Sequence, residues 1–169
     1  VSKSDGSVWF TDPTYGSDSE YEGDKADAEQ EGSYVYRIDP ASGAVTAMIT
    51  DMVKPNGLAF SPDESVLYVA DTGATHVENG PRHLRAFHVG AGGALSGGDV
   101  LAPCDTGLFD GFRIDIHGNI WTSAGDGVHC LTPQGELIGK VLTGEVVANV
   151  EFGGITRNRL SICATTTLR

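Results

Sequence analysis

Three segments of the chain share one pattern, in which a short apolar strand opens with an asparagine or aspartate and a second strand follows. The openers are Asn56, Asp110 and Asn149. The second strands are centred eleven or twelve residues later, on Tyr68, Trp121 and Ser161. A repeat that places one oxygen-bearing side chain at the same point of each unit predicts units arranged in a ring. We expect these side chains to converge near its centre.

The N-terminal end predicts a further unit of the same kind. Residues 7–11 have the composition of a second strand, so the matching polar opener would lie two or three residues before Val1. Residues 1–4 would then be the rest of an innermost strand. The chain starts with Val and stops at Arg169 with its last unit half built, so we expect a piece of a longer protein.

Alternating apolar runs divide the chain into four-stranded antiparallel units. Turn signals such as Asp5-Gly6, Pro62-Asp63 and His117-Gly118 separate successive strands. The pattern predicts an all-β chain that forms one partial β-propeller domain over residues 1–169, with about three to four blades and with N-terminal blades missing. A β-sandwich would show no such internal register. The expected strands are residues 7–12, 34–39 and 45–50, then 56–61, 66–70, 84–89 and 100–103, then 111–115, 119–123, 127–131 and 137–142, and finally 148–152 and 160–164.

Composition limits the classes of partner. The 169 residues are 40% hydrophobic, which is enough for a real core, and 23 Gly and 7 Pro suit a chain with many turns. Eleven basic and 23 acidic residues give a net charge of −12, which argues against nucleic acid or an anionic membrane and is compatible with a cation site. No apolar run approaches the roughly 20 residues that span a bilayer. We expect a soluble protein, and the sequence leaves a cytoplasmic and a periplasmic or secreted location equally open.

Several other chemistries fit the sequence poorly. The chain has no Gly-x-Ser-x-Gly motif of a serine esterase, and its five histidines lack the spacing of a zinc hydrolase. The glycine-rich residues 90–98 lack the lysine of a phosphate-binding loop and predict a hairpin loop. We expect Cys104, Cys130 and Cys163 to be buried free thiols, and His129 to be structural.

Residues 15–32 break the strand pattern. They contain seven acidic residues and a single Lys25, which is too polar a composition for a core strand. A solvated acidic loop or short helix is one interpretation. The other is a lid over the central pocket, because the segment follows the strand that ends near Asp12.

A series of short motifs runs through almost the whole chain in a fixed order. They are Asp5-Gly-Ser-Val-Trp-Phe-Thr-Asp-Pro13, Lys54-Pro-Asn-Gly-Leu-Ala-Phe-Ser-Pro-Asp63, Leu67-Tyr-Val-Ala-Asp-Thr72, Asp110-Gly-Phe-Arg-Ile-Asp115 and Phe152-Gly-Gly154. Together they resemble the SMP-30/gluconolactonase/LRE-like family of regucalcin-like sugar lactonases. The resemblance implies a six-bladed β-propeller that hydrolyses a sugar lactone.

The resemblance also implies one divalent cation in the central channel, most often Ca²⁺, with Zn²⁺, Mg²⁺ and Mn²⁺ as alternatives. Two of the four protein ligands of the family match Asn56 and Asp110. The other two, an asparagine in a Pro-Asn-Asp motif and an earlier glutamate, would lie upstream of Val1. The chain therefore carries half of the implied ligands, and we expect it to be inactive by itself.

Asn56 and Asp110 have the chemistry that such a site needs. Ca²⁺ takes about 6 to 8 oxygen ligands, and a bound cation can polarise a lactone carbonyl or the attacking water. The resemblance makes Asp110 the candidate general base, because a carboxylate beside the cation can accept a proton from that water. Since Asn-Gly and Asp-Gly are also common turn sequences, a purely structural role stays open for both residues.

Four further residues are candidates for the substrate pocket. Asn149 holds the third equivalent place but matches no ligand of the family, so we expect it in the pocket wall. Asp12, Tyr15 and Asp71 follow strands that lead to the pocket mouth, and structural turn roles are equally open for them.

Lactone hydrolysis is the leading functional hypothesis. Aryl ester or phosphotriester hydrolysis on the same scaffold is one alternative, and a calcium-binding propeller without catalysis is another. The partner would be a small-molecule lactone. An incomplete ring leaves blade edges open, so we also expect self-association through those edges.

Overall fold

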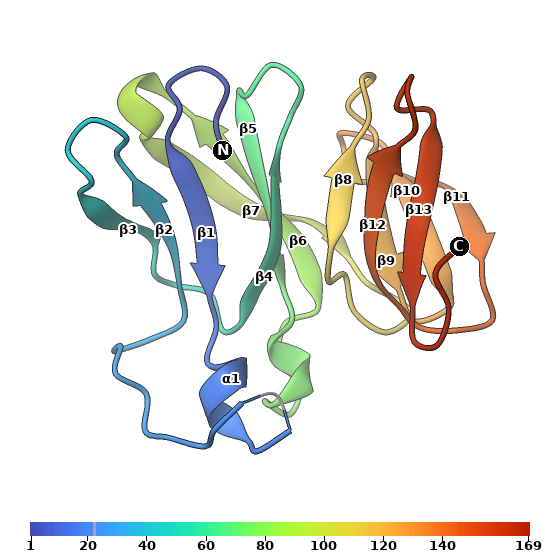
Figure 1. Ribbon diagram of the computed structural model, residues 1–169, viewed down its shortest axis with the longest axis horizontal. Coiled ribbons are helices and arrows are strands. Elements are labelled where there is room, and N and C mark those ends of the chain that lie inside the picture. Colours follow the sequence, from blue (N-terminus) through green and yellow to red (C-terminus); the bar gives the residue numbers. More distant parts are fainter. Residues whose placement is uncertain (22) are drawn as a thin grey trace.

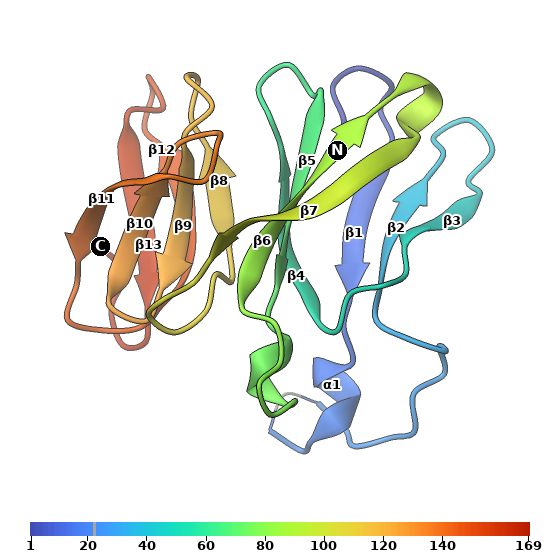
Figure 2. The same cartoon turned by 180° about the vertical axis from the view of Figure 1, so that it is seen from behind.

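A computed structural model describes residues 1–21 and 23–169 and contains four antiparallel sheets that follow one another in an arc (Figure 1; Figure 2). Each sheet is called a blade below. The prediction of an all-β propeller arc is confirmed. None of the helices in the described part of the chain is long and apolar enough to cross a membrane.

The blades have the strand order that the repeat predicts. The first blade comprises β1 (Val8–Asp12), β2 (Tyr34–Ile38) and β3 (Val45–Ile49). The second comprises β4 (Pro55–Phe60), β5 (Val66–Asp71), β6 (His83–Val89) and β7 (Leu95–Pro103). The third comprises β8 (Phe112–Ile114), β9 (Ile120–Ala124), β10 (Gly127–Leu131) and β11 (Leu137–Leu142), and the fourth has β12 (Val147–Gly153) and β13 (Arg159–Ala164). The neighbours β4 and β8, and β8 and β12, pack side by side, so these innermost strands line one side of the arc.

Among the described residues, three short helices interrupt the strands, namely α1 (Tyr15–Asp18), η1 (Gly73–Thr75) and η2 (Ala91–Gly93). The acidic segment of residues 15–32 begins with α1, and its other described residues form no strand, as the composition predicts. Glu22, one of its seven acidic residues, lies outside the described residues.

Two sequence-based boundaries are wrong. Residues 1–4 form no strand, and instead make a turn in which the Ser2 backbone N–H donates to the Ser7 carbonyl at 2.8 Å. The carboxylate of Glu64 in the second blade accepts from the backbone N–H groups of Lys3 and Ser4 at 2.6 and 2.9 Å, which takes the place of strand pairing. The expected hairpin loop over residues 90–98 is shorter than predicted, because β7 already begins at Leu95.

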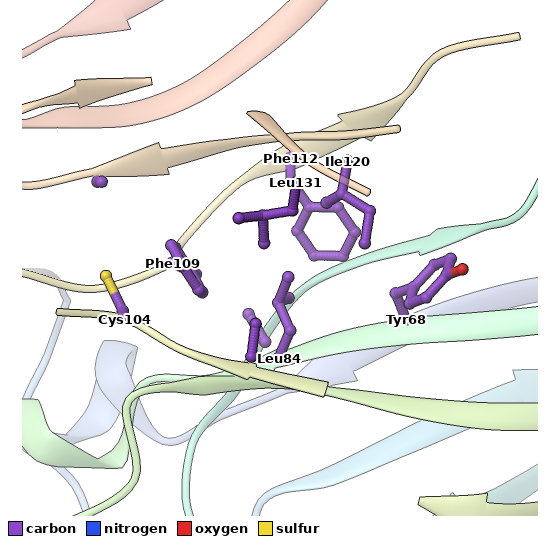
Figure 3. Close-up of a cluster of buried hydrophobic side chains, with 10 residues drawn as sticks. Tyr68, Leu84, Cys104, Phe109, Phe112, Ile120 and Leu131 are labelled. Atoms are coloured by element: carbon purple, nitrogen blue, oxygen red, sulfur yellow. The ribbon is translucent and has the colours of Figure 1, made fainter. Parts of the chain in front are cut away.

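The core lies between the blades. Phe109, Phe112 and Ile120 of the third blade pack against Leu84 of the second in a cluster that Figure 3 shows from close by. A second cluster joins the first and second blades, and a third joins the third and fourth. Because neighbouring blades cover both faces of a middle strand, β10 is buried at every position, whereas β11 is exposed at every position.

The cysteines are free, and two of them are buried as predicted. Cys163 is exposed, so the prediction of a buried thiol is wrong there. It alternates along β13 with Ile162, whose side chain takes the buried face.

Candidate functional site

The three polar openers lie next to one another at the N-terminal ends of the innermost strands. The Gly57 backbone N–H donates to the Asp110 carbonyl at 3.1 Å, which joins the second blade to the third. The Gly111 N–H donates to the Ala148 carbonyl at 2.9 Å, which joins the third blade to the fourth. The structure therefore brings Asn56, Asp110 and Asn149 together across three adjacent blades, at the lower ends of β4, β8 and β12 in Figure 1.

Two glycines make this close approach possible. A Cβ added at Gly57 would lie 2.1 Å from the Asp110 carbonyl oxygen, and one at Gly111 would lie 2.3 Å from the side-chain oxygen of Asn149. Gly57 belongs to strand β4 and is not among the residues with positive φ. The Asn-Gly pair is therefore not a turn. The small residue is needed because the next blade passes against it.

The Asn56 side chain is half-buried, and a neighbouring hydroxyl orients it. Its Nδ2 donates to Thr72 Oγ1 at 3.3 Å. The Thr72 hydroxyl in turn donates to the Lys54 carbonyl at 3.1 Å. With the amide nitrogen on Thr72, the amide oxygen points away from Thr72.

Asp110 is half-buried, and β9 fixes its backbone. The Asp110 N–H donates to Ser123 Oγ at 2.9 Å, and the Ser123 N–H donates to the Gly111 carbonyl at 3.0 Å. Ser123 is fully buried, so this anchor belongs to the rigid interior of the third blade. The two hydrogen bonds hold the backbone of Asp110 and of Gly111 against β9.

Asn149 is exposed at the start of the fourth blade, and its side-chain oxygen accepts from the Val150 N–H at 2.8 Å. Its amide group covers Gly111, the residue that follows Asp110. This position is compatible with the pocket-wall role that the repeat suggests, which stays a prediction.

Tyr15 lies close to one of the openers, Asn56, whereas Asp12 lies elsewhere. The Tyr15 hydroxyl in α1 lies 2.7 Å from Thr72 Oγ1, the same oxygen that orients Asn56. Asp12 is exposed at the end of β1 and lines a separate hollow with Thr14 and Ala28. The structure thus brings Tyr15 into the candidate site and places Asp12 beside the acidic segment.

Asp71 lies inside the scaffold, with 3% of its surface exposed. Its carboxylate accepts from the backbone N–H groups of Val53 and Lys54, both at 2.9 Å, and of Gly73 at 3.1 Å. These bonds tie the entry to β4 to the end of β5. Of the two roles left open for Asp71, this geometry agrees better with a structural role than with a place at the pocket mouth.

Sequence reasoning missed Lys54. Its side chain is buried, with its Nζ in contact with Thr14 Oγ1 and Asp18 Oδ2 and 5.0 Å from the centre of the Tyr15 ring. Lys54 therefore fastens α1 beside Asn56, and its hydrogen bond is the main cause that lowers the pKa of Asp18. A lysine directly before Pro55 in an otherwise apolar segment was the available signal.

His129 is buried on β10, and its Nε2 lies 2.6 Å from the Asp126 carboxylate, which also accepts from Lys140 at 2.9 Å. The burial of the ring and its contact with Asp126 agree with the structural role that we expected. Among the described residues, His, Cys, Asp and Glu form no group of three that could hold a metal ion. A cation site at the openers would therefore depend on amide as well as carboxylate oxygens.

A wide hollow of about 990 Å³ lies at the other ends of the innermost strands, lined by Phe60, Ile114 and Phe152. It does not include Asn56, Asp110 or Asn149. The candidate site therefore lies at the openers and is separate from this hollow.

The successive antiparallel sheets, with polar openers at equivalent places, define an arc of β-propeller blades. A family model of the SMP-30/gluconolactonase/LRE-like region matches residues 1–166. The chain therefore belongs to the SMP-30/gluconolactonase/LRE-like family.

Individual relatives agree with this assignment. A lactonohydrolase of Aspergillus oryzae is 31% identical over 92% of this chain and 39% of its own length. A gluconolactonase of Zymomonas mobilis is 32% identical over 88% of this chain and 42% of its own length. The chain thus spans about two fifths of the curated relatives that it matches.

Solved structures of similar proteins also match this chain over about half of their own length. A gluconolactonase from Xanthomonas campestris superposes with a TM-score of 0.86 at 36% identity, covering 97% of this chain and 52% of that one. Regucalcin from Agrobacterium tumefaciens, described as a calcium-binding protein, gives a TM-score of 0.65 at 26% identity, covering 78% of this chain and 44% of that one.

Proposed function

We propose that the protein to which this chain belongs hydrolyses a sugar lactone with the help of a divalent cation held by Asn56 and Asp110. One observation carries the proposal. The backbone hydrogen bond from Gly57 to the Asp110 carbonyl brings the segments that carry Asn56 and Asp110 together at the same end of two neighbouring innermost strands. The similarity to gluconolactonases and a lactonohydrolase supports the reaction class.

The donor set fits a hard cation. The amide nitrogen of Asn56 donates to Thr72, so the amide oxygen points away from Thr72 and would be the atom that binds the cation. Amide and carboxylate oxygens are the ligands that Ca²⁺ prefers, with water completing the shell. The similarity to a calcium-binding regucalcin supports Ca²⁺ as the first ion to test.

In the proposed reaction, Asn56 and Asp110 would hold the ion where it polarises the lactone carbonyl and stabilises charge on its oxygen. Asp110 accepts a proton from the attacking water through its carboxylate. Ser123 fixes the backbone of Asp110, and thereby limits the positions its carboxylate can take. Tyr15, whose hydroxyl contacts Thr72, and Asn149, whose amide covers Gly111, would contact the sugar.

A lactonase assay tests this proposal. Hydrolysis of glucono-δ-lactone by the protein to which this chain belongs is followed by proton release, with added calcium and with chelator, after subtraction of spontaneous hydrolysis. Asp110→Asn keeps the size of the side chain but removes the base, so we expect turnover to fall by about 10²- to 10⁴-fold. Asp105→Asn is the matched control, since Asp105 is exposed in the same loop.

The outcomes separate the functional classes. Loss of turnover in Asp110→Asn and in chelator, with an unchanged melting temperature, supports the proposal. Full turnover in Asp110→Asn contradicts the general-base role. Calcium-dependent stabilisation without turnover on any sugar lactone would indicate a calcium-binding propeller without catalysis.

A further inference from the structure

The Thr72 hydroxyl is a buried junction between β4, η1 and α1. Only 1% of the residue surface is exposed. Its Oγ1 lies 3.3 Å from Asn56 Nδ2, 2.7 Å from the Tyr15 hydroxyl and 3.1 Å from the Lys54 carbonyl oxygen. One oxygen atom thus contacts both a residue of β4, Asn56, and a residue of α1, Tyr15.

A hydroxyl has a single hydrogen to donate. Thr72 directs that hydrogen to the Lys54 carbonyl, which can only accept. Toward Asn56 the Thr72 oxygen therefore presents a lone pair, and a lone pair selects the NH₂ end of the amide. The opposite rotamer would set two acceptor oxygens against each other in a buried place, which costs the hydrogen bond and adds repulsion.

We propose that Thr72 is a positioning residue that fixes the amide rotamer of Asn56, so that its Oδ1 faces the cation. The inference rests on the proposed function, since it assigns a task to Thr72 at the same site. Thr72 itself does not touch the ion. Residues that orient the ligands of a metal typically change its affinity by about 10- to 100-fold when they are mutated.

Calcium titration by calorimetry, carried out on the protein to which this chain belongs, tests the role without any need for turnover. Thr72→Val keeps the shape of the side chain and removes the hydroxyl, and we expect it to weaken calcium binding by about tenfold. Thr72→Ser keeps the hydroxyl and should bind calcium within about twofold of the wild type. Thr75→Val is the matched control, because Thr75 also contacts the Tyr15 hydroxyl, at 2.9 Å, but is not a partner of Asn56.

A double-mutant cycle separates positioning from general support of the fold. Aspartate has two equivalent oxygens, so its rotamer does not decide which atom faces the ion. In an Asn56→Asp background, Thr72→Val should therefore change the calcium affinity by less than about threefold. An equal loss in both backgrounds would overturn the inference, because Thr72 would then act only through the fold.

The remaining outcomes are distinguishable. If the wild type binds calcium, Asn56→Ala abolishes binding and Thr72→Val binds as tightly as the wild type, the positioning role is wrong and the proposed site stands. If the wild type takes up no calcium, the proposed function fails and the inference fails with it. Thr72→Ala, which also lacks the hydroxyl, replaces Thr72→Val if that variant does not fold.

Discussion

The backbone N–H of Gly57 donates to the carbonyl oxygen of Asp110 at 3.1 Å, so the two candidate ligand segments are directly bonded across a blade boundary. This bond requires that β4 and the start of the third blade approach without a side chain between them. The geometry of the candidate site and the packing of two blades therefore depend on the same few atoms.

Gly57→Ala should destabilise the chain. The new Cβ would lie 2.1 Å from the Asp110 carbonyl oxygen and 3.2 Å from Gly111 Cα, so the blades must separate. We expect a loss of about 1–3 kcal/mol in the free energy of unfolding, measured by urea denaturation. Gly139→Ala in β11 is the control, because its Cβ meets nothing within 4 Å. Equal stability of Gly57→Ala and the wild type would contradict this account of the blade contact.

Lys54→Met should release α1. The methionine side chain fills similar space but cannot bind Asp18 or Thr14, both of which Lys54 contacts. We expect trypsin to cleave after Lys25 faster than in the wild type, since Lys25 lies in the segment that α1 begins. Lys140→Met, which breaks a more exposed ion pair with Asp126, should leave this rate unchanged. An unchanged rate in Lys54→Met would show that another contact holds the segment.

Asp115 should make the chain less stable in acid. Burial raises the pKa of its carboxyl, but hydrogen bonds from Trp121, Asn119 and His117 lower it by more, so the folded-state pKa lies below the usual value of an aspartate. Because the unfolded chain binds the proton more readily, this stabilisation is present above about pH 4 and is lost as the pH falls.

Urea midpoints measured from about pH 6 down to about pH 3 test this sign. Asp115→Asn should lower the midpoint at the upper end of the range and reduce its dependence on pH. Tryptophan fluorescence provides a local signal, because Trp121 Nε1 donates to Asp115 Oδ2 at 3.0 Å. Asp99→Asn, at an exposed site on β7, serves as the control. A midpoint that rises as the pH falls would refute the assignment.

The chain should self-associate through β11, because this strand has exposed apolar side chains. Ile138 and Leu142 in this strand are 58% and 69% exposed, and an exposed apolar edge strand favours pairing with a second copy. Sedimentation velocity over a range of concentrations should show a species larger than the monomer. Ile138→Lys should reduce it, whereas Val77→Lys, at an exposed loop position, should not. A monomer at every concentration would contradict the prediction.

The repeat in the sequence predicted the blades and the meeting of Asn56, Asp110 and Asn149, because equivalent positions in a regular repeat occupy equivalent places in the fold. It did not predict the role of Gly57, since Asn-Gly is a common turn sequence and the near contact comes from the next blade. The anchors of the site were missed for a similar reason. Lys54 reaches Asp18 across 36 residues, and nothing local distinguishes Asp18 from the other acids of its segment.

Residues 1–4 show the limit of the repeat. Their apolar and polar pattern suits a strand, but the Glu64 carboxylate binds their backbone N–H groups and a turn forms instead. A side chain from the next blade decides this local structure, so the sequence of the segment alone could not reveal it.

The most direct test of the central claim is a crystal structure of the protein grown with Mn²⁺, with anomalous scattering recorded to locate the ion. We predict an anomalous peak bounded by Asn56 Oδ1 and the Asp110 carboxylate, with Asn56 Nδ2 still on Thr72. A well-ordered site with both side chains in place and no peak between them would contradict the account.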